Sequence, residues 1–200
     1  MWEERYATPD YVFGREPAAF LTDHADLLTP GHTALAVADG EGRNSVFMAQ
    51  KGMKVTALDV APSAIAKAQA LAADKGVSVT FRQTDVLAHD WPETFDLVAG
   101  IFIQFVGPDQ RDRLFEGMRR SVRPGGLILL HGYTPEQIAL GTGGPPFAEN
   151  MYTEAMLRAA FGDWEILECR AHEREIFEGQ GHRGRSALID LVARRPATGA

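Results

Sequence analysis

Two glycines and two aspartates stand where a chain of alternating strands and helices would place a ligand. Gly40 and Gly42 follow the apolar run Thr33–Ala38, and Asp59 and Asp85 end the next two runs. Glycine lets a backbone pass close to a ligand. A carboxylate ending the second strand can accept hydrogen bonds from the two ribose hydroxyls, and one ending the third can accept from an adenine amine. Together these residues predict an adenosine pocket.

Each of these residues also has an ordinary structural explanation. A glycine loop taken alone is equally compatible with a tight strand-to-helix turn, and a strand-end aspartate is commonly solvated or caps a helix. Their occurrence at successive strand ends favours the pocket. The backbone N–H of Val86, next to Asp85, would then meet a ring nitrogen of the adenine.

The glycine spacing argues against a dinucleotide. A dinucleotide loop requires three glycines, and the corresponding positions here are Ala38, Gly40 and Arg43. Arg43 is far too large for a position where a helix packs close to its strand. No G-x-x-x-x-G-K-[ST] motif occurs, which excludes a Walker loop. The loop instead suits the close approach of a small uncharged group, so NAD and FAD are disfavoured.

A second set of side chains could contact the molecule on which such a site acts. The candidates are His131, Tyr133, Glu175, His182 and Arg185. The simpler alternatives are a strand-end histidine bonded to the backbone for His131, a solvated turn residue for His182, and a strand cap or a pair with Glu178 for Arg185. No close spacing of metal ligands supports a metal site, so we predict none.

Composition and charge restrict the partners. The 200 residues carry a formal net charge of −7 and no basic run, which disfavours nucleic acid. A single cysteine, Cys169, fits a reducing compartment. No apolar run approaches the roughly 20 residues of a membrane span, and the acidic, aromatic N-terminus is unlike a signal peptide. We expect a cytoplasmic protein that binds neither membrane nor nucleic acid.

The elements that would position these residues alternate regularly. The predicted strands are Thr33–Ala38, Lys54–Val60, Val77–Val86, Phe95–Ile103 and Leu127–Tyr133, and helical segments separate most of them. The tail adds a helix, Tyr152–Gly162, and two strand-like runs joined by the turn EGQGHR. This order predicts a single α/β domain with a Rossmann-like, doubly wound sheet. The sheet should be mostly parallel, with an antiparallel C-terminal hairpin strand.

We divide this domain into three parts. Residues 1–30 form an N-terminal lid and helix, residues 31–133 a cofactor-binding core, and residues 134–200 an acceptor-side loop, helix and hairpin. Ligands of open α/β sheets bind outside the carboxyl ends of the strands. The loop Gly141–Phe147 should overhang that edge, and an N-terminal segment rich in aromatic residues has the length to fold across it. That segment could equally be a helix packed on the domain edge.

Five pieces of the sequence resemble one family, the class I S-adenosylmethionine-dependent methyltransferases. They are AVADGEGRN, ALDVAPSAI, the TDV of Thr84–Val86, FDLVAGIF and RPGGLILL, in the family's order and within residues 33–133. The first segment and the tail EREIFEGQGHRGRSALIDLVARRP resemble one branch more closely. That branch comprises the small methyltransferases related to the tellurite-resistance and thiopurine types.

The resemblance implies that S-adenosylmethionine is the cofactor and indicates the residues that hold it. These are Arg5, Tyr11, Ala38, Asp39, Gly40, Arg43, Asn44, Asp59, Val60, Asp85, Val86, Gly100 and Ile101. The Gly100 carbonyl and the Arg5 side chain would meet the amine and carboxylate of the cofactor. His131, Tyr133, His182 and Arg185 are the candidate catalytic residues.

The chain departs from the family pattern at the start of the glycine loop. Ala36 stands where the family has an acidic residue, and Ala38 stands at the first glycine. Asp39 could take over part of the lost electrostatic role. The family branch implies a small-molecule acceptor, such as a thiol or a chalcogen oxyanion, and a monomer or homodimer. The alternative is a module that binds S-adenosylmethionine or S-adenosylhomocysteine without turnover.

Overall fold

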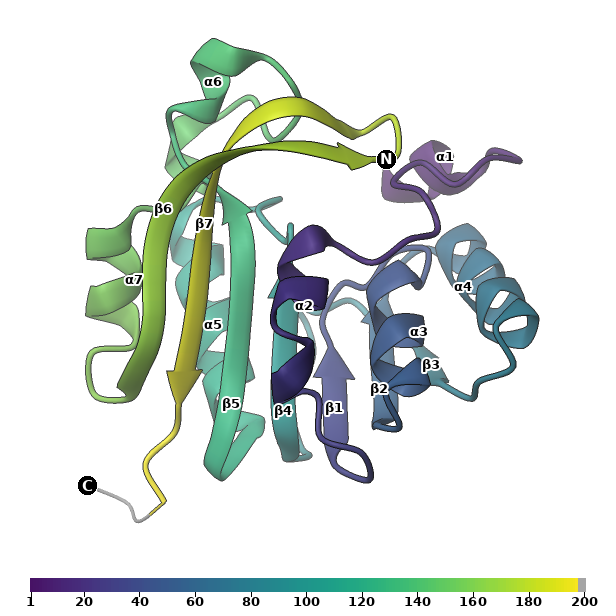
Figure 1. The fold of residues 1–200 in the computed structure, drawn as a ribbon, viewed down its shortest axis with the longest axis horizontal. Coiled ribbons are helices and arrows are strands. Elements are labelled where there is room, and N and C mark those ends of the chain that lie inside the picture. The colour runs from purple at the N-terminus through teal and green to yellow at the C-terminus, as the bar shows by residue number, and fades with distance from the viewer. Residues whose placement is uncertain (198–200) are drawn as a thin grey trace.

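A seven-stranded sheet forms the centre of the molecule in the computed structural model, which describes residues 1–197 (Figure 1). The strand order is β3-β2-β1-β4-β5-β7-β6. The strands are β1 (Thr33–Ala36), β2 (Lys54–Asp59), β3 (Thr80–Gln83), β4 (Phe95–Ile101), β5 (Val122–Tyr133), β6 (Glu165–Glu178) and β7 (His182–Arg194). Strands β1 to β5 are parallel, and β7 runs antiparallel to both β5 and β6. The predicted fold class is confirmed.

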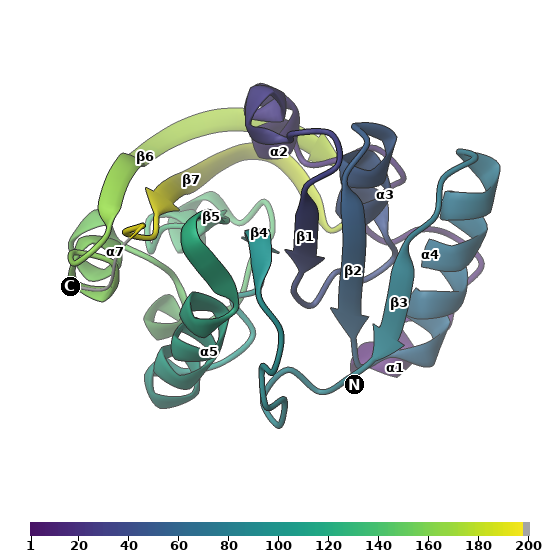
Figure 2. The same cartoon turned by 90° about the horizontal axis from the view of Figure 1, so that it is seen from below.

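Helices cover both faces of this sheet. They are α1 (Trp2–Tyr6), α2 (Ala19–Asp23), α3 (Arg43–Gln50), α4 (Pro62–Asp74), α5 (Pro108–Arg120), α6 (Gln137–Leu140) and α7 (Glu154–Ala160), with short 3-10 turns at Ala25–Leu27 and Ala148–Asn150. Figures 1 and 2 show α2, α3 and α4 on one face and α5 and α7 on the other. Helices α4 and α5 both begin with proline, whose fixed φ suits the first helical turn.

The central strands are apolar because both of their faces are buried. In β4, Val98 packs with the cluster on the α5 side, whereas Leu97 and Ala99 pack with the cluster on the α2 and α3 side. Ala36, at the end of β1, belongs to the latter cluster. The position where the methyltransferase pattern has an acid is therefore an apolar core position in this chain.

The long hairpin β6–β7 bends over the carboxyl edge of the sheet and reaches the N-terminal segment (Figure 1). Three of the differences from the predicted elements bear on the site. Helix α1 lies within the predicted lid, β3 is only four residues long, and β5 begins at Val122 instead of Leu127. No helix within residues 1–197 is both long and apolar enough to cross a bilayer.

Candidate functional site

The glycine loop leaves β1 in a left-handed backbone conformation. Ala38, Gly40 and Gly42 have φ values of +49°, +64° and +87°. A Cβ on Gly42 would lie 2.6 Å from the Cβ of Ala68 in α4, so only glycine allows α3 and α4 to pack this closely. In a dinucleotide loop the third glycine, which corresponds to position 43 here, allows close packing of the helix. In this chain Gly42 has that role. Ala38 is a non-glycine residue in a sparsely populated region, which is a feature common at binding sites.

Asp59 ties this loop to the end of β2. Its carboxylate accepts hydrogen bonds from the backbone N–H groups of Gly40, at 2.8 Å, and Ala61, at 2.9 Å. Burial raises the pKa of Asp59, and these two N–H groups oppose that effect. Each carboxylate oxygen still has a lone pair available for a hydroxyl. The residue therefore fits the predicted contact with ribose while also fixing the loop.

Replacing Asp59 by alanine should weaken cofactor binding by about 1.5–3 kcal/mol, the range for hydrogen bonds to a charged group. The variant also frees the Gly40 N–H, so we expect a small fall in the melting temperature. Isothermal titration calorimetry with S-adenosylhomocysteine measures the affinity. Asp74→Ala removes an exposed carboxylate that pairs with Arg15 and serves as the control. An unchanged dissociation constant for the Asp59 variant would remove Asp59 from the site.

Three other predicted cofactor residues, Asp85, Val86 and Asp39, differ in their exposure and in their hydrogen-bond partners. Asp85 is exposed and accepts from the Leu87 N–H at 2.9 Å, and Val86 beside it is buried. Asp39 accepts from the backbone N–H of Ser45 at 3.2 Å and from its hydroxyl at 2.5 Å. Burial raises the pKa of Asp39 to about 6. Its carboxylate is engaged with the first turn of α3, which differs from the expected role beside the cofactor amine.

Three polar residues that follow Gly40, namely Glu41, Arg43 and Asn44, make contacts that the sequence analysis did not predict. Glu41 is almost fully buried, and its carboxylate accepts from the Val12 and Phe13 N–H groups at 3.1 and 3.3 Å. Its other partner is Lys67, at 2.8 Å. The loop thereby holds the N-terminal segment directly. An acid between two glycines of a binding loop was the available signal for Glu41.

Arg43 and Asn44 hold two further covering segments. Arg43 forms a buried ion pair of 2.8 Å with Glu178 at the end of β6. The Asn44 side chain accepts from the N–H of Ala18, just before α2. Both residues were predicted to bind the cofactor, and the structure shows their side chains connecting α3 to the hairpin and to α2. This dense set of contacts makes the loop the point where three distant segments meet.

Aromatic side chains of the N-terminal segment cover the loop. The ring of Tyr6 lies over Gly40, since a Cβ on that glycine would be 2.9 Å from the Tyr6 hydroxyl. Trp2 stacks on Tyr6 and meets Phe105, which follows β4, edge-on. Arg5 lies 5.0 Å over the ring of Phe13. We call residues 1–13 the lid.

Tyr11 is an exception within this lid. Its hydroxyl donates to the backbone carbonyl of Lys67 at 2.9 Å, and its ring packs with Leu71 and Ala72 on α4. The ring therefore lies on the helical layer. This placement differs from the predicted contact with the cofactor.

The end of β4 brings three predicted catalytic residues around one ring. Phe102 has a φ of +56°, which is rare for a bulky residue. Its ring lies 4.1 Å from that of His182, 4.8 Å from that of His131 and 4.9 Å from that of Tyr133. The two residues before it, Gly100 and Ile101, are the predicted cofactor contacts on this strand. The strained conformation of Phe102 had no sequence signal.

His182 lies between two aromatic rings at the mouth of this region. It stacks on Phe102 and, at 4.6 Å, on Phe13 of the lid, while its Nδ1 is 2.5 Å from the Tyr133 hydroxyl. Burial, with a contribution from the Arg43 charge, lowers the pKa of His182 to about 2. Gly143 pairs with His182, so the loop Gly141–Phe147 lies beside this histidine.

The lowered pKa of His182 predicts a loss of stability in acid. Below pH 6.5 the unfolded chain binds a proton at this position while the folded chain does not, so unfolding is favoured as the pH falls toward 2. The stabilisation of the wild type relative to His182→Gln should fall by about 1.4 kcal/mol per pH unit in this window. Urea unfolding at pH 7.5 and pH 4.5 measures it, with exposed His32→Gln as control. Parallel curves for the wild type and the His182 variant would contradict the prediction.

The remaining predicted residues differ in their exposure. Arg185 is 64% exposed and pairs with Glu173 across the hairpin at 2.6 Å. We therefore withdraw it from the candidate acceptor groups. It forms an ion pair, as in the simpler alternative, but the partner is Glu173 instead of Glu178. Glu175 is exposed, and Val60 is 46% exposed at the end of β2. Among residues 1–197, no three His, Cys, Asp or Glu side chains come together as metal ligands.

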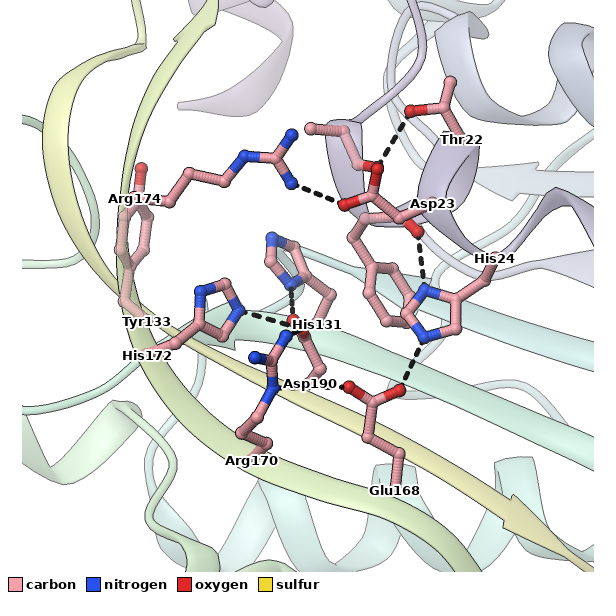
Figure 3. A network of polar contacts seen from close by, with 12 residues as sticks. Thr22, Asp23, His24, His131, Tyr133, Glu168, Arg170, His172, Arg174 and Asp190 are labelled. Atoms are coloured by element: carbon pink, nitrogen blue, oxygen red, sulfur yellow. Dashed lines mark hydrogen bonds and ion pairs between the residues drawn. The ribbon is translucent and has the colours of Figure 1, made fainter.

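His131 lies on the α2 side of the sheet, within the polar network of Figure 3. Its Nδ1 lies 2.7 Å from Asp190, which His172 also contacts at 2.8 Å, and its ring stacks on Phe20. Although burial opposes ionisation, the hydrogen bonds from both histidines hold the pKa of Asp190 well below its usual range. The predicted backbone-bonded alternative for His131 is wrong, because its ring nitrogen meets a carboxylate.

Comparison with known proteins identifies the core of this chain. A family model described as a methyltransferase domain matches residues 34–126. Just under half of the chain is therefore similar to a methyltransferase domain. This domain includes the glycine loop, Asp59, Asp85 and the end of β4, which are the features that carried the sequence resemblance. The family interpretation is therefore confirmed.

Individual relatives share this domain at moderate similarity. The ubiquinone biosynthesis O-methyltransferase of Pseudomonas entomophila (strain L48) is 35% identical over 100 residues, which are 49% of this chain and 43% of that protein. This chain thus matches less than half the length of these curated relatives. TehB from Haemophilus influenzae is 21% identical, with a TM-score of 0.74 over 97% of this chain and 65% of that one.

A second solved structure has a comparable fold. It comes from work on the conversion of a disulfide bond into a thioacetal group during echinomycin biosynthesis. It is 20% identical, with a TM-score of 0.76 over 97% of this chain and 87% of that one. Both structural likenesses cover 97% of this chain and therefore extend the shared fold beyond the matched domain.

Proposed function

We propose that this protein transfers a methyl group from S-adenosylmethionine to a small-molecule acceptor. The observation that carries the proposal is the glycine loop of a methyltransferase domain, fixed by Asp59 and covered by the ring of Tyr6. Asp59 and Asp85 would hold the adenosine part. The backbone at Gly40 and Gly100 would approach the methionine part.

Several residues fit this cofactor. A Cβ on Gly40 would fill the space beneath the Tyr6 hydroxyl, so glycine keeps the loop open at that point. Asp59 has acceptor capacity for two hydroxyls, as ribose requires. Aromatic rings of the lid offer π faces, which attract a cationic group such as a sulfonium. S-adenosylmethionine supplies an electrophilic methyl group on a good leaving group.

The chain itself would act mainly by positioning. Orientation of two reactants in one site supplies much of the acceleration of a displacement reaction. The lid and the hairpin meet through Phe13 and His182, and this contact would exclude water from the reacting groups. The ion pair between Arg43 and Glu178 connects the hairpin β6–β7 to α3. The neutral His182 and the Tyr133 hydroxyl provide polar contacts for an acceptor without introducing a charge.

Sulfur or oxygen acceptors fit this site better than amines of nucleobases or proteins. The sequence has no D/N-P-P-Y/F motif. One structural neighbour concerns sulfur chemistry, the formation of a thioacetal, and one curated relative is an O-methyltransferase. The branch resemblance adds thiols and chalcogen oxyanions such as selenite or tellurite. We propose that the acceptor is a small thiol or a chalcogen oxyanion. Hydroxyl compounds such as phenols are the alternative class of acceptor to be tested beside them.

Calorimetry and product analysis test this proposal. S-adenosylmethionine should bind and NAD should not, because the loop lacks the three glycines of a dinucleotide site. Incubation with a panel of thiols, phenols, selenite and tellurite should yield S-adenosylhomocysteine with at least one acceptor. Heat from NAD alone would contradict the cofactor assignment.

A non-catalytic binding module is the second candidate, and Ala36 is the observation that favours it. This residue lies in the apolar core, and Asp39 is engaged with Ser45, so no carboxylate of the loop replaces the family acid. Binding of S-adenosylmethionine without product from any acceptor would support the module. The intact Asp59 contact and the lid favour the enzyme.

A further inference from the structure

A polar cavity lies between α2 and the strands β6 and β7. Its volume is about 390 Å³. Its walls come from α2, β5, β6 and β7, and its lining includes Phe20, His131, His172, Leu188 and Asp190. The glycine loop contributes no residue to it. The cavity is large enough for a small organic molecule and has no part in the cofactor contacts described above.

Asp190 organises the polar wall of this cavity (Figure 3). It is 4% exposed, and its two oxygens meet Nδ1 of His131 and Nε2 of His172. A carboxylate can only accept hydrogen bonds, so each of these two nitrogens carries the hydrogen. The opposite nitrogen of a neutral imidazole then has a free lone pair. His131 thus presents Nε2 as a proton acceptor, with its ring fixed by Asp190 and by stacking on Phe20.

His131 connects the cavity with the expected methyl-transfer region. On β5 it pairs with Ile101 of β4, one of the predicted cofactor residues. Its ring meets Phe102 at 4.8 Å, and Phe102 stacks on His182 beneath the lid. The same residue therefore lines the cavity and borders the site at the carboxyl edge of the sheet.

We propose that this cavity admits the methyl acceptor and that His131 is the general base that deprotonates it. The proposal rests on the proposed methyl transfer. It requires an acceptor whose nucleophilic atom carries a dissociable proton, as in a thiol or a phenol, and it disfavours oxyanions that have no proton to lose. The geometry of an imidazole held by a buried carboxylate is the arrangement by which proteins fix a histidine tautomer for proton transfer.

The step balances without a further reactant. Nε2 of His131 takes the proton of the acceptor X–H group, and the freed electron pair on X forms the bond to the methyl carbon. The bond from that carbon to the sulfonium sulfur breaks, and its electron pair stays on sulfur. The imidazolium, stabilised by Asp190, then loses its proton to water through the cavity.

The cavity also contains other groups that can influence this proton transfer. Besides His131 and Asp190, the charged or titratable residues that line the cavity are Asp23 and His24 from α2 and Glu168, Arg170, His172, Glu173, Arg174 and Glu178 from β6. His182 of β7 lies outside the cavity and stacks on the Phe102 ring, which also contacts His131. Glu168 pairs with His24 at 2.6 Å, and Arg170 lies 3.9 Å from Asp190. Because these groups also titrate, the pH dependence of turnover can be assigned to His131 only by comparing the wild type with variants that change His131 or Asp190 alone.

A cofactor-free probe separates this inference from the proposed function. The probe is 4-nitrophenol, whose phenolate absorbs visible light. Bound to the wild type, it should ionise at a pH at least one unit below that of the free compound, which is a tenfold shift in its ionisation constant. His131→Gln and Asp190→Asn should abolish this shift, whereas His32→Gln, outside the cavity and exposed, should keep it. Retention of the shift in the first two variants would overturn the proposal, as would a wild type that does not bind the probe.

Turnover provides the second measurement. With a phenol or thiol acceptor at saturating cofactor, His131→Gln should lower kcat by about 100-fold or more, the usual contribution of a general base. The affinity for S-adenosylhomocysteine should stay unchanged. If His131→Gln does not fold, as its melting curve would show, Asp190→Asn keeps the shape of the site and decides the question by the same two measurements. Unchanged kcat in a folded variant would overturn the role of His131.

The two failures are distinguishable. If no variant, including the wild type, forms S-adenosylhomocysteine with any acceptor, the proposed function fails, and the probe still reports whether the cavity ionises a phenol. If the wild type transfers methyl groups while both variants match it, methyl transfer stands and the inference about His131 fails. Methylation of selenite or tellurite but of no thiol or phenol would likewise overturn the inference.

Discussion

Gly40→Val is expected to abolish binding of S-adenosylmethionine. Gly40 has a φ of +64°, and its Cβ would lie 2.9 Å from the Tyr6 hydroxyl. A β-branched residue disfavours that backbone conformation and would displace either Tyr6 or the loop. A displaced loop also loses the hydrogen bond from its N–H to Asp59. Calorimetry with S-adenosylmethionine should show a loss of affinity of more than about 100-fold, equivalent to ~2.8 kcal/mol.

A matched control separates backbone strain from loss of the site. Gly76 has a φ of +66° and open space around its Cβ position. Gly76→Val therefore introduces the same strain at the end of α4 without blocking a ligand, and it should lower the melting temperature but leave the affinity unchanged. Gly40→Ala combined with Tyr6→Phe removes the hydroxyl that crowds the Cβ and should recover part of the binding. Normal affinity of Gly40→Val in a folded protein would show that the loop is only a connection.

The sequence was sufficient for the fold class and for the position of the glycine loop between the first strand and the helix that follows it. Apolar runs bounded by glycine or proline mark strands that are buried on both faces, and this signal is local. Strand ends follow directly from strand positions, so Asp59 and Asp85 could be located at the carboxyl edge before any contact was known. The likeness of the whole pattern to one family agreed with the fold class that this alternation predicts.

Side-chain partners could not be predicted in the same way, because they depend on segments far apart in the chain. Arg43 meets Glu178 across 135 positions, and His131 meets Asp190 across 59. Nothing in the local sequence of Arg43 distinguishes a cofactor contact from a buried ion pair. The bend of β6 and β7 brings Glu178 over α3, and the antiparallel pairing of β5 with β7 places Asp190 opposite His131. Both are tertiary features without a periodic signature in the sequence.

Strand alternation alone would have corrected one prediction. Arg185 and Ser186 are neighbours on β7 and face opposite sides, with Ser186 fully buried and Arg185 exposed. The apolar run that follows, from Ala187 onward, already indicates where the strand becomes buried. His182, at the start of the strand, is buried and stacks on Phe13 of the lid.

Removing residues 1–13 should lower turnover more than it lowers cofactor affinity. These residues supply Tyr6 over Gly40 and Phe13 against His182, and they contribute to none of the main core clusters on the two faces of the sheet. The truncated domain should therefore fold, with a melting curve that remains cooperative. We expect the affinity for S-adenosylhomocysteine to fall by about tenfold, or ~1.4 kcal/mol. Turnover should fall by about 100-fold, as expected when reacting groups lose their orientation.

A point variant tests the same lid without shortening the chain. Glu41→Ala removes the carboxylate that accepts from the Val12 and Phe13 N–H groups, so Phe13 should lose its fixed position against His182 while Tyr6 remains. Glu3→Ala, which breaks an exposed contact between α1 and Ser63, is the control and should have little effect. Because a closed lid excludes water from a reactive sulfonium, kcat should decrease in the order wild type, Glu41→Ala, truncated chain. Equal kcat for all of these proteins at saturating cofactor would show that the lid only packs against the domain edge.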